Sequence, residues 1–199
     1  MDGKEQYEKA LRAARKAQIT GGPLPVALLE ESASAGYPPA LYALANWHLH
    51  GKGVRKNFKK ATALLRKSAD RKYAPAEYDL AVSYELGKGI KRNLKAAFIY
   101  YRRAANDGDP DAPAEVARCY YYAIGAAKDL SKAAQWYLKA AKLGDADAQY
   151  AIARAYELGE GVQKNIAKAI DWYRQAAAQG DSAAQVAAQE LQITTARAG

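Results

Sequence analysis

The chain has 199 residues, of which 50% are apolar and 26% charged, and its formal net charge is +9 at pH 7. This length and composition predict one domain or a short repeat array, and they exclude a multidomain enzyme and a globally disordered chain. The single cysteine excludes an internal disulfide framework and a cysteine-rich zinc module. No stretch approaches the roughly 18 apolar residues of a membrane span, and the first residues do not resemble a leader peptide. We therefore expect no membrane insertion and a cytoplasmic protein, with a processed exported form as the alternative.

Two helices are expected before the regular part of the chain, over residues 5–18 and 25–35. From Gly36 onward, glycines recur every 36 residues, with Lys72 in the one slot that lacks a glycine. A fixed period between 20 and 50 residues predicts a solenoid of stacked repeats. One column in this register, which we expect to be buried, contains Leu64, Tyr100, Trp136 and Trp172.

Each period contains two expected helices. The first helix of each repeat is expected over residues 39–50, 76–86, 112–122 and 148–158. The second helix follows a good N-cap residue, which is in turn Asn57, Asn93, Asp129 and Asn165. Because Lys72 and Ala123 stand where glycine would end a helix, we expect distorted helix ends there, with the helix continuing through Ala123.

About eleven helices result, and they predict an all-α fold formed by one solenoid over residues 1–193. Its segments are a degenerate N-terminal repeat (1–36), four repeats (37–72, 73–108, 109–144 and 145–180) and a capping helix (181–193). A frayed tail is expected over residues 194–199.

Three segments of the chain carry a resemblance to a known family: QYAIARAYELGEGV at 149–162, KAIDWYRQAAAQG at 168–180 and KAAQWYLKAA at 132–141. These segments resemble the two halves of a Sel1-like repeat, which is related to the tetratricopeptide repeat. The resemblance covers about residues 25–191 and implies a right-handed α/α superhelix that binds proteins as a scaffold or adaptor. It also implies a bacterial setting in signalling, secretion-system assembly or immunity.

No set of residues in the sequence indicates catalysis or metal binding. His48 and His50 are two positions apart on a helix, which turns their side chains to opposite faces. His48 shares its column with Tyr84, Tyr120 and Tyr156, so we expect it to pack between helices. We therefore expect a non-enzymatic protein without catalytic residues, metal or cofactor. The alternative is a β-lactamase-like hydrolase, as described for cysteine-rich relatives, although the chain lacks their paired cysteines and a Ser-x-x-Lys motif.

The first helix of each repeat lines the concave side in related superhelices. Four columns on this helix lie outside the expected core stripe, and they predict a face that binds a protein or peptide. The residues of this face are Ala43, Asn46, Trp47, His50, Asp79, Val82, Ser83, Glu115, Arg118, Cys119 and Arg154. Trp47 is the expected anchor because a large aromatic side chain off the packing stripe is typical of interfaces. Its alternative role is packing against the preceding unit.

Most of the positive charge is concentrated in residues 37–72 and continues into the next repeat. Because equivalent turns of a solenoid stack along one edge, these residues predict a basic edge. The basic edge comprises Lys52, Arg55, Lys56, Lys59, Lys60, Lys88, Lys91, Arg92 and Lys95. Its expected role is to attract an acidic protein partner, and binding of nucleic acid or another polyanion is the less favoured alternative. An ordinary solvated edge is a third alternative. We expect a monomer or a weak dimer.

Overall fold

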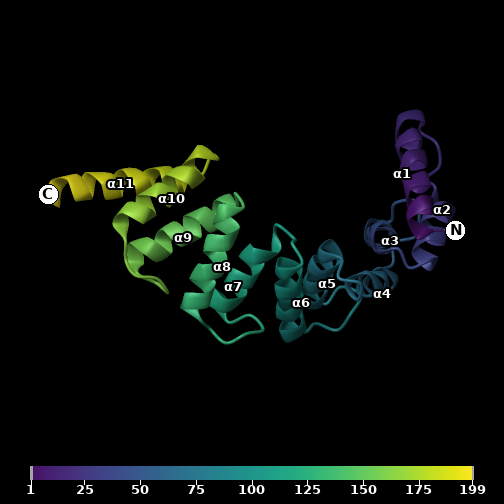
Figure 1. The fold of residues 1–199 in the computed structure, drawn as a ribbon, viewed down its shortest axis with the longest axis horizontal. Helices are drawn as coiled ribbons and strands as arrows, with labels where there is room; N and C mark the ends of the chain where they lie inside the picture. Colours follow the sequence, from purple (N-terminus) through teal and green to yellow (C-terminus); the bar gives the residue numbers. More distant parts are fainter. Residues whose placement is uncertain (1, 199) are drawn as a thin grey trace. The chain divides into compact units, whose positions relative to one another are not determined.

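The computed structural model describes residues 2–198, and these residues form eleven α-helices and no β-strand (Figure 1). The helices are α1 (Gly3–Thr20), α2 (Val26–Ser34), α3 (Pro38–His50), α4 (Phe58–Ala69), α5 (Ala74–Leu86), α6 (Leu94–Asn106), α7 (Ala112–Tyr122), α8 (Leu130–Lys142), α9 (Ala146–Leu158), α10 (Ile166–Ala178) and α11 (Ser182–Ala198). The expected helix order is confirmed.

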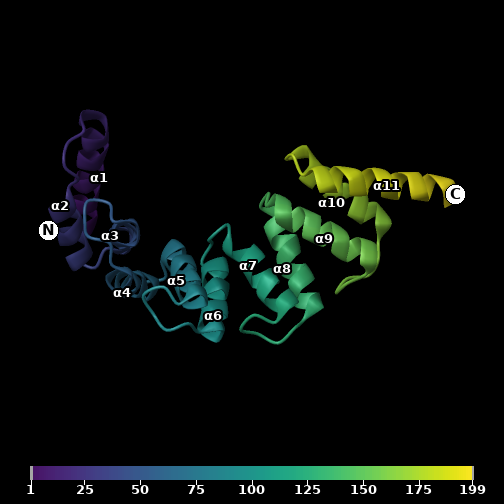
Figure 2. The same cartoon turned by 180° about the vertical axis from the view of Figure 1, so that it is seen from behind.

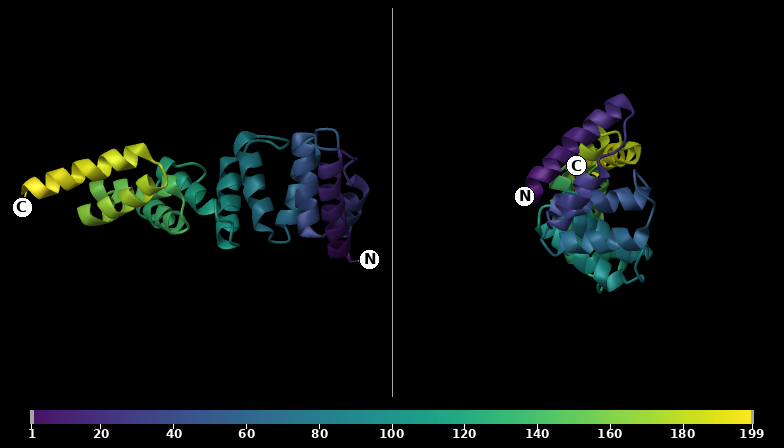
Figure 3. Two further views of the ribbon diagram at one scale, coloured as in Figure 1. Left: turned by 90° about the horizontal axis from the view of Figure 1, so that it is seen from above. Right: turned by 90° about the vertical axis from the view of Figure 1, so that its right-hand side faces the viewer.

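The chain divides into two compact units, Met1–Asp109 and Pro110–Gly199. In the N-terminal unit each helix from α1 to α6 packs on the next one, and α1 also contacts α3 (Figure 3). In the C-terminal unit α7 to α11 pack in the same successive way (Figure 2). This stacking in chain order confirms the predicted all-α solenoid. A single array over residues 1–193 stays a prediction.

Alanine forms much of the core in both units. Ala40, Ala76 and Ala153 are fully buried on the first helices, where small side chains allow neighbouring helices to approach closely. The predicted burial of the aromatic column is wrong for Trp136 and Trp172, which are only partly buried. The following column is deeper at Tyr173, which is 1% exposed. Its ring packs edge-on against Tyr150 of α9, and its hydroxyl donates to the carboxylate of Glu157 at 2.7 Å.

The second helices begin at the predicted N-cap residues. The side-chain oxygens of Asn57 and Asn93 accept hydrogen bonds of 3.0 Å from the backbone N–H three residues later. Asp129 and Asn165 do the same at 2.9 Å. Each bond satisfies one backbone donor that the start of a helix leaves free, which fixes where the helix begins.

The helix ends at Lys72 and Ala123 differ from the prediction. Both residues adopt the left-handed conformation that glycine usually provides, with φ of 58° and 59°. α7 ends at Tyr122, so the expected continuation through Ala123 is wrong. The N–H of Ile124 still donates to the carbonyl of Cys119 at 2.9 Å. The hydrogen bonds of the cap therefore hold Ala123 in a conformation that costs about 1–2 kcal/mol for a residue with a Cβ.

The expected frayed tail over residues 194–199 is also wrong, because α11 continues to Ala198. The hydroxyls of Thr194 and Thr195 donate at 2.8 Å to carbonyls four residues earlier in this helix. Gly199 lies outside the described residues.

Adjacent repeats meet where a turn packs on the start of a preceding helix. The turn after α5 lies against the first residues of α4, and Thr62 donates from its hydroxyl to the carbonyl of Gly89 at 3.2 Å. A Cβ at Gly89 would overlap the backbone carbonyl of Phe58, and a Cβ at Gly161 would overlap that of Leu130. Glycine is required at both positions because of this close approach of two backbones as well as the positive φ.

We expect Gly89→Ala to lower the free energy of unfolding by clearly more than Gly108→Ala. Both glycines have positive φ, so each alanine costs about 1–2 kcal/mol in backbone strain. Only Gly89 faces a backbone atom, since nothing lies within 4 Å of a Cβ at Gly108. Urea denaturation of the two variants measures the difference, and equal losses would contradict the close approach.

Candidate functional site

A groove of about 600 Å³ lies between α1 and α3 in the N-terminal unit. Its lining is mainly apolar, and Leu11 remains 47% exposed at this surface. The apolar lining residues are Ala10, Leu11, Ala14, Ala17, Leu24, Leu29, Ala43 and Trp47. The groove therefore offers a concave apolar surface next to the first helix of the first repeat.

Trp47 forms part of the groove wall. It is partly buried and packs against a cluster that includes Ala10, Leu29 and Leu44. Trp47 thus packs against the preceding helices, which is the alternative to an interface anchor given above. It also lines the groove. A rigid aromatic ring held in this way can contact a ligand with little loss of conformational entropy.

Cationic side chains line the groove alongside the apolar surface. Arg15 and Lys52 are exposed, and within residues 2–198 neither forms an ion pair. Arg12 lies 3.7 Å from the carboxylate of Glu8, the single acidic residue of the lining. The groove therefore combines an apolar surface with excess positive charge.

Between α3 and α5 the equivalent surface is polar. The hydroxyl of Tyr42 is hydrogen-bonded with the carboxylate of Asp79, and the side chain of Asn46 also interacts with this hydroxyl. Burial raises the pKa of Asp79, while the hydrogen bond to Tyr42 and the nearby His50 oppose the rise. Burial and the charge of Asp79 raise the pKa of Tyr42. These side chains satisfy one another and leave a polar patch.

Two residues of the predicted binding face are not at the surface. Cys119 is fully buried, and Ser83 is 4% exposed with its hydroxyl donating to the carbonyl of Asp79 at 2.8 Å. Both share a column with Trp47, and Ala155 in the same column is also buried. This column therefore belongs to the core at the positions that hold a small residue, because neighbouring helices can pack closely over a small side chain.

The remaining predicted face residues are accessible to different extents. Glu115 and Arg118 on α7 form an ion pair of 2.7 Å, so each partly neutralises the other. Val82 is partly buried on α5, whereas Arg154 is exposed on α9. Sequence reasoning missed Leu11, Arg15 and Leu24 because they precede the regular repeats. The available signal was Leu11, an apolar residue at the border of the core stripe of residues 5–18.

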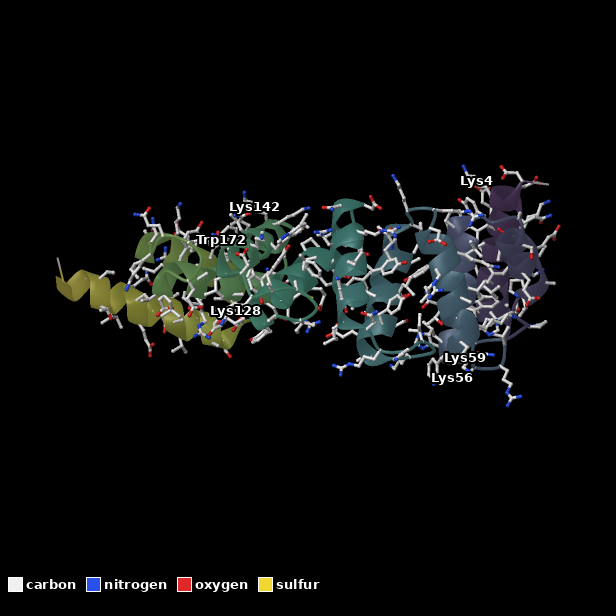
Figure 4. All side chains as sticks on the ribbon, turned by 90° about the horizontal axis from the view of Figure 1, so that it is seen from below. Lys4, Lys56, Lys59, Lys128, Lys142 and Trp172 are labelled. Atoms are coloured by element: carbon white, nitrogen blue, oxygen red, sulfur yellow. The ribbon has the colours of Figure 1, made fainter. Side chains whose placement is uncertain are left out.

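All nine residues of the basic edge are exposed. Lys56 and Lys59 project from the same edge of the N-terminal unit (Figure 4). The hydrogen bond from Thr62 to Gly89 shows that the second basic turn of this unit packs against the first residues of α4, which directly follow the first basic turn. Lys60 lies 3.8 Å from the carboxylate of Glu30, but this exposed pair is weak.

The histidines have separate environments. The Nδ1 atom of His48 lies 3.1 Å from the carbonyl oxygen of Arg55 in a buried site, which confirms its predicted packing role. His50 is exposed at the end of α3. Within residues 2–198, no group of three or more His, Cys, Asp or Glu residues is arranged to hold a metal ion. None of the described helices is both long enough and apolar enough to cross a membrane.

A family model described as Sel1 repeat matches residues 38–73, 74–109, 110–145 and 146–181. The chain belongs to the Sel1 repeat family. This family consists of scaffold proteins that commonly mediate protein interactions. Because α1 and α2 precede the first matched segment, the groove lies where the first Sel1 repeat meets helices that the family model does not match.

Solved bacterial structures share this fold. A Sel1 repeat protein from Oxalobacter formigenes is 32% identical with a TM-score of 0.77 over 83% of this chain and 48% of its own. The protective antigen c5321 from uropathogenic Escherichia coli, described as having an SLR fold, is 26% identical with a TM-score of 0.82 over 96% and 44%. The immunity protein Pa5087 from Pseudomonas aeruginosa is 26% identical with a TM-score of 0.51. The match covers 92% of this chain and 67% of the immunity protein.

This chain therefore spans about half the length of the first two structures. No curated protein sequence matches the chain.

We expect the Sel1 repeat protein to lose stability relative to its Asp79→Asn variant as the pH rises from 4 to 8. Because the folded pKa of Asp79 is raised, the folded state binds a proton more tightly than the unfolded chain. Stability from this group is therefore present below the unfolded pKa and lost as the pH rises through the folded pKa. Urea denaturation across this range measures the effect, with Asp70→Asn as the exposed control. Parallel curves for wild type and Asp79→Asn would contradict the expectation.

Proposed function

We propose that the chain is a non-enzymatic scaffold that binds an acidic protein or peptide segment on the face formed by its first helices. The observation that carries this proposal is the groove between α1 and α3, with Trp47 in its wall and the unpaired cations Arg15 and Lys52 beside it. The family supports a protein partner, since Sel1 repeat proteins commonly mediate protein interactions.

The size and chemistry of the groove support an extended contact with side chains. A volume of about 600 Å³ accommodates several side-chain groups, and the partly exposed Leu11 and Trp47 provide apolar contact. Carboxylates that flank an apolar anchor on the partner would meet Arg15 and Lys52. The partner that fits is therefore a segment with bulky apolar residues between acidic ones.

Two side chains with nucleophilic or acid–base chemistry that the sequence singled out have structural environments. Cys119 is fully buried, and His48 makes a backbone contact. Neither side chain is therefore placed to act on a substrate. Among the bacterial settings that the resemblance implies, we propose to test immunity first, because a similar solved structure is named as an immunity protein.

We expect two variants each to weaken binding of a selected peptide at least tenfold. One is the single variant Trp47→Ala, and the other is the double variant Arg15→Gln with Lys52→Gln. The probe is a fluorescent peptide enriched by the purified chain from a random phage-displayed library, and fluorescence anisotropy measures its affinity. Loss of the indole removes apolar contact, and loss of the two cations removes pairing with the acidic residues.

Two controls make this prediction specific. Lys67→Gln removes an exposed cation of α4 that does not line the groove, so it should leave affinity unchanged. Trp47→Phe keeps an aromatic ring and should retain most of the binding if Trp47→Ala proves unstable. The groove would be refuted as the binding site if the peptide kept its affinity in all three variants, namely the Arg15 and Lys52 double variant, Trp47→Phe and Trp47→Ala.

The second candidate function is binding of nucleic acid or another polyanion, which the exposed basic edge favours. We expect the double variant Lys56→Glu and Lys59→Glu to slow association of the selected peptide severalfold and to leave dissociation nearly unchanged, because these charges attract the partner without touching it. Surface plasmon resonance separates the two rates.

A single-stranded oligonucleotide should bind weakly, and its affinity should fall steeply with salt. Tight oligonucleotide binding at physiological salt would instead establish the second candidate.

A further inference from the structure

A second and smaller pocket, of about 190 Å³, lies in the C-terminal unit between α7, α8 and α9. Its lining combines small side chains, including Ala133, Ala134 and Ala151, with four tyrosines. The tyrosines are Tyr121, Tyr122, Tyr137 and Tyr150. We call this site the tyrosine pocket.

The tyrosine pocket occupies the same register as the groove of the N-terminal unit, three repeat lengths further along the chain. Ala151 and Tyr137 of the pocket correspond to Ala43 and Leu29 of the groove. The further corresponding pairs are Ala14 and Tyr122, Gly22 and Leu130, Trp47 and Ala155, and Lys52 and Glu160. The fold therefore places two concave sites at equivalent positions, one in each unit, and gives them different chemistry.

Small side chains make room for the pocket. Between α3 and α5, the positions equivalent to Ala134 and Ala151 are Thr62 and Asp79. Thr62 is hydrogen-bonded to Gly89, and Asp79 is hydrogen-bonded with Tyr42, so both larger side chains are engaged within the protein. Alanine at the two positions in the C-terminal unit leaves that volume to a ligand.

The pocket presents hydroxyl donors that have no acceptor within residues 2–198. Neither Tyr122, Tyr137 nor Tyr150 donates its hydroxyl hydrogen to another of these residues. Burial raises the pKa of Tyr137 to about 12, so its hydroxyl stays protonated and able to donate at neutral pH. A hydroxyl in the lining that has no acceptor in the protein can donate to a ligand that carries one.

The pocket offers one cation that an acidic group of a ligand can pair with. Arg154 is exposed in the lining, and no residue in the described part of the chain forms an ion pair with it. Glu160 is the only acidic residue of the lining, and its carboxylate accepts a hydrogen bond of 3.3 Å from Tyr121. The ammonium of Lys128 lies 5.8 Å from the centre of the Tyr121 ring and adds positive charge at this wall.

We propose that the tyrosine pocket is a second docking site, which takes one bulky apolar side chain of an acidic peptide segment while Arg154 pairs with a carboxylate next to it. This inference rests on the proposed scaffold function and adds a second site of narrower specificity. A cavity of about 150 Å³ holds a benzene-sized group, so the pocket suits a single phenylalanine or leucine side chain. The groove is larger and accepts more than one.

The test uses the full chain and the same phage-displayed random peptide library. Peptides that bind the tyrosine pocket should contain phenylalanine or leucine beside aspartate or glutamate. Their affinity, measured by fluorescence anisotropy, should fall at least tenfold in Ala134→Phe and in Arg154→Gln. Phenylalanine is a tolerated filler because the equivalent position of the second repeat already contains Phe98, which is buried. Thermal unfolding of Ala134→Phe checks that the fold is intact.

The control Arg174→Gln removes an exposed cation of the same unit that does not line the tyrosine pocket, and it should leave these affinities unchanged. The peptides should also keep their affinity in the Trp47→Ala variant, which separates the two sites. Isothermal titration calorimetry with one such peptide should show a site that disappears in Ala134→Phe.

The outcomes distinguish this inference from the proposed function. The tyrosine pocket would be overturned, and the scaffold function left in place, by one result. In that result every selected peptide loses affinity in Trp47→Ala and keeps its affinity in both Ala134→Phe and Arg154→Gln. Enrichment of lysine or arginine in pocket-dependent peptides would overturn the assigned chemistry. Failure of the wild-type chain to enrich any peptide would overturn both proposals.

Discussion

The close approach of a turn to the start of a preceding helix governs how these repeats pack. Gly89 lies against the backbone of Phe58, and Gly161 lies against that of Leu130, with no room for a side chain at either glycine. Backbone contacts of this kind fix how one repeat is offset from the next. First helices within a unit therefore lie beside one another in a constant register, and any concavity between them recurs at the same positions.

This constant register separates the geometry of the sites from their chemistry. Equivalent positions on the first helices of the four repeats hold Ala43, Asp79, Glu115 and Ala151. Alanine contributes to a groove at Ala43 and to a pocket at Ala151, whereas Asp79 forms a hydrogen-bonded polar patch with Tyr42. A substitution at one such position can open or close a site without any change of the backbone. The repeated fold thus allows each unit to present different side-chain chemistry at equivalent positions.

The fold could be predicted from the sequence because its determinants are local and repeated. The period, the N-cap residues such as Asn57 and the alanine stripe each specify a feature of one helix pair. The candidate site was harder to predict. On an isolated helix Ser83 and Cys119 lie outside the core stripe. Their burial depends on neighbouring helices, about which the pattern of a single helix carries no information. Leu11 and Arg15 were missed because residues 1–36 do not follow the repeat pattern closely.

The left-handed conformations of Lys72 and Ala123 have a consequence for dynamics. Each of these helix ends holds a residue with a Cβ where the equivalent ends are closed by glycine, so part of the capping energy is offset by strain. Local opening should therefore cost less free energy after α4 and α7 than at the ends that glycine closes. Amide hydrogen exchange is fastest where opening is least costly. We therefore expect amide exchange at the ends of α4 and α7 to be faster than at the equivalent helix ends that glycine closes.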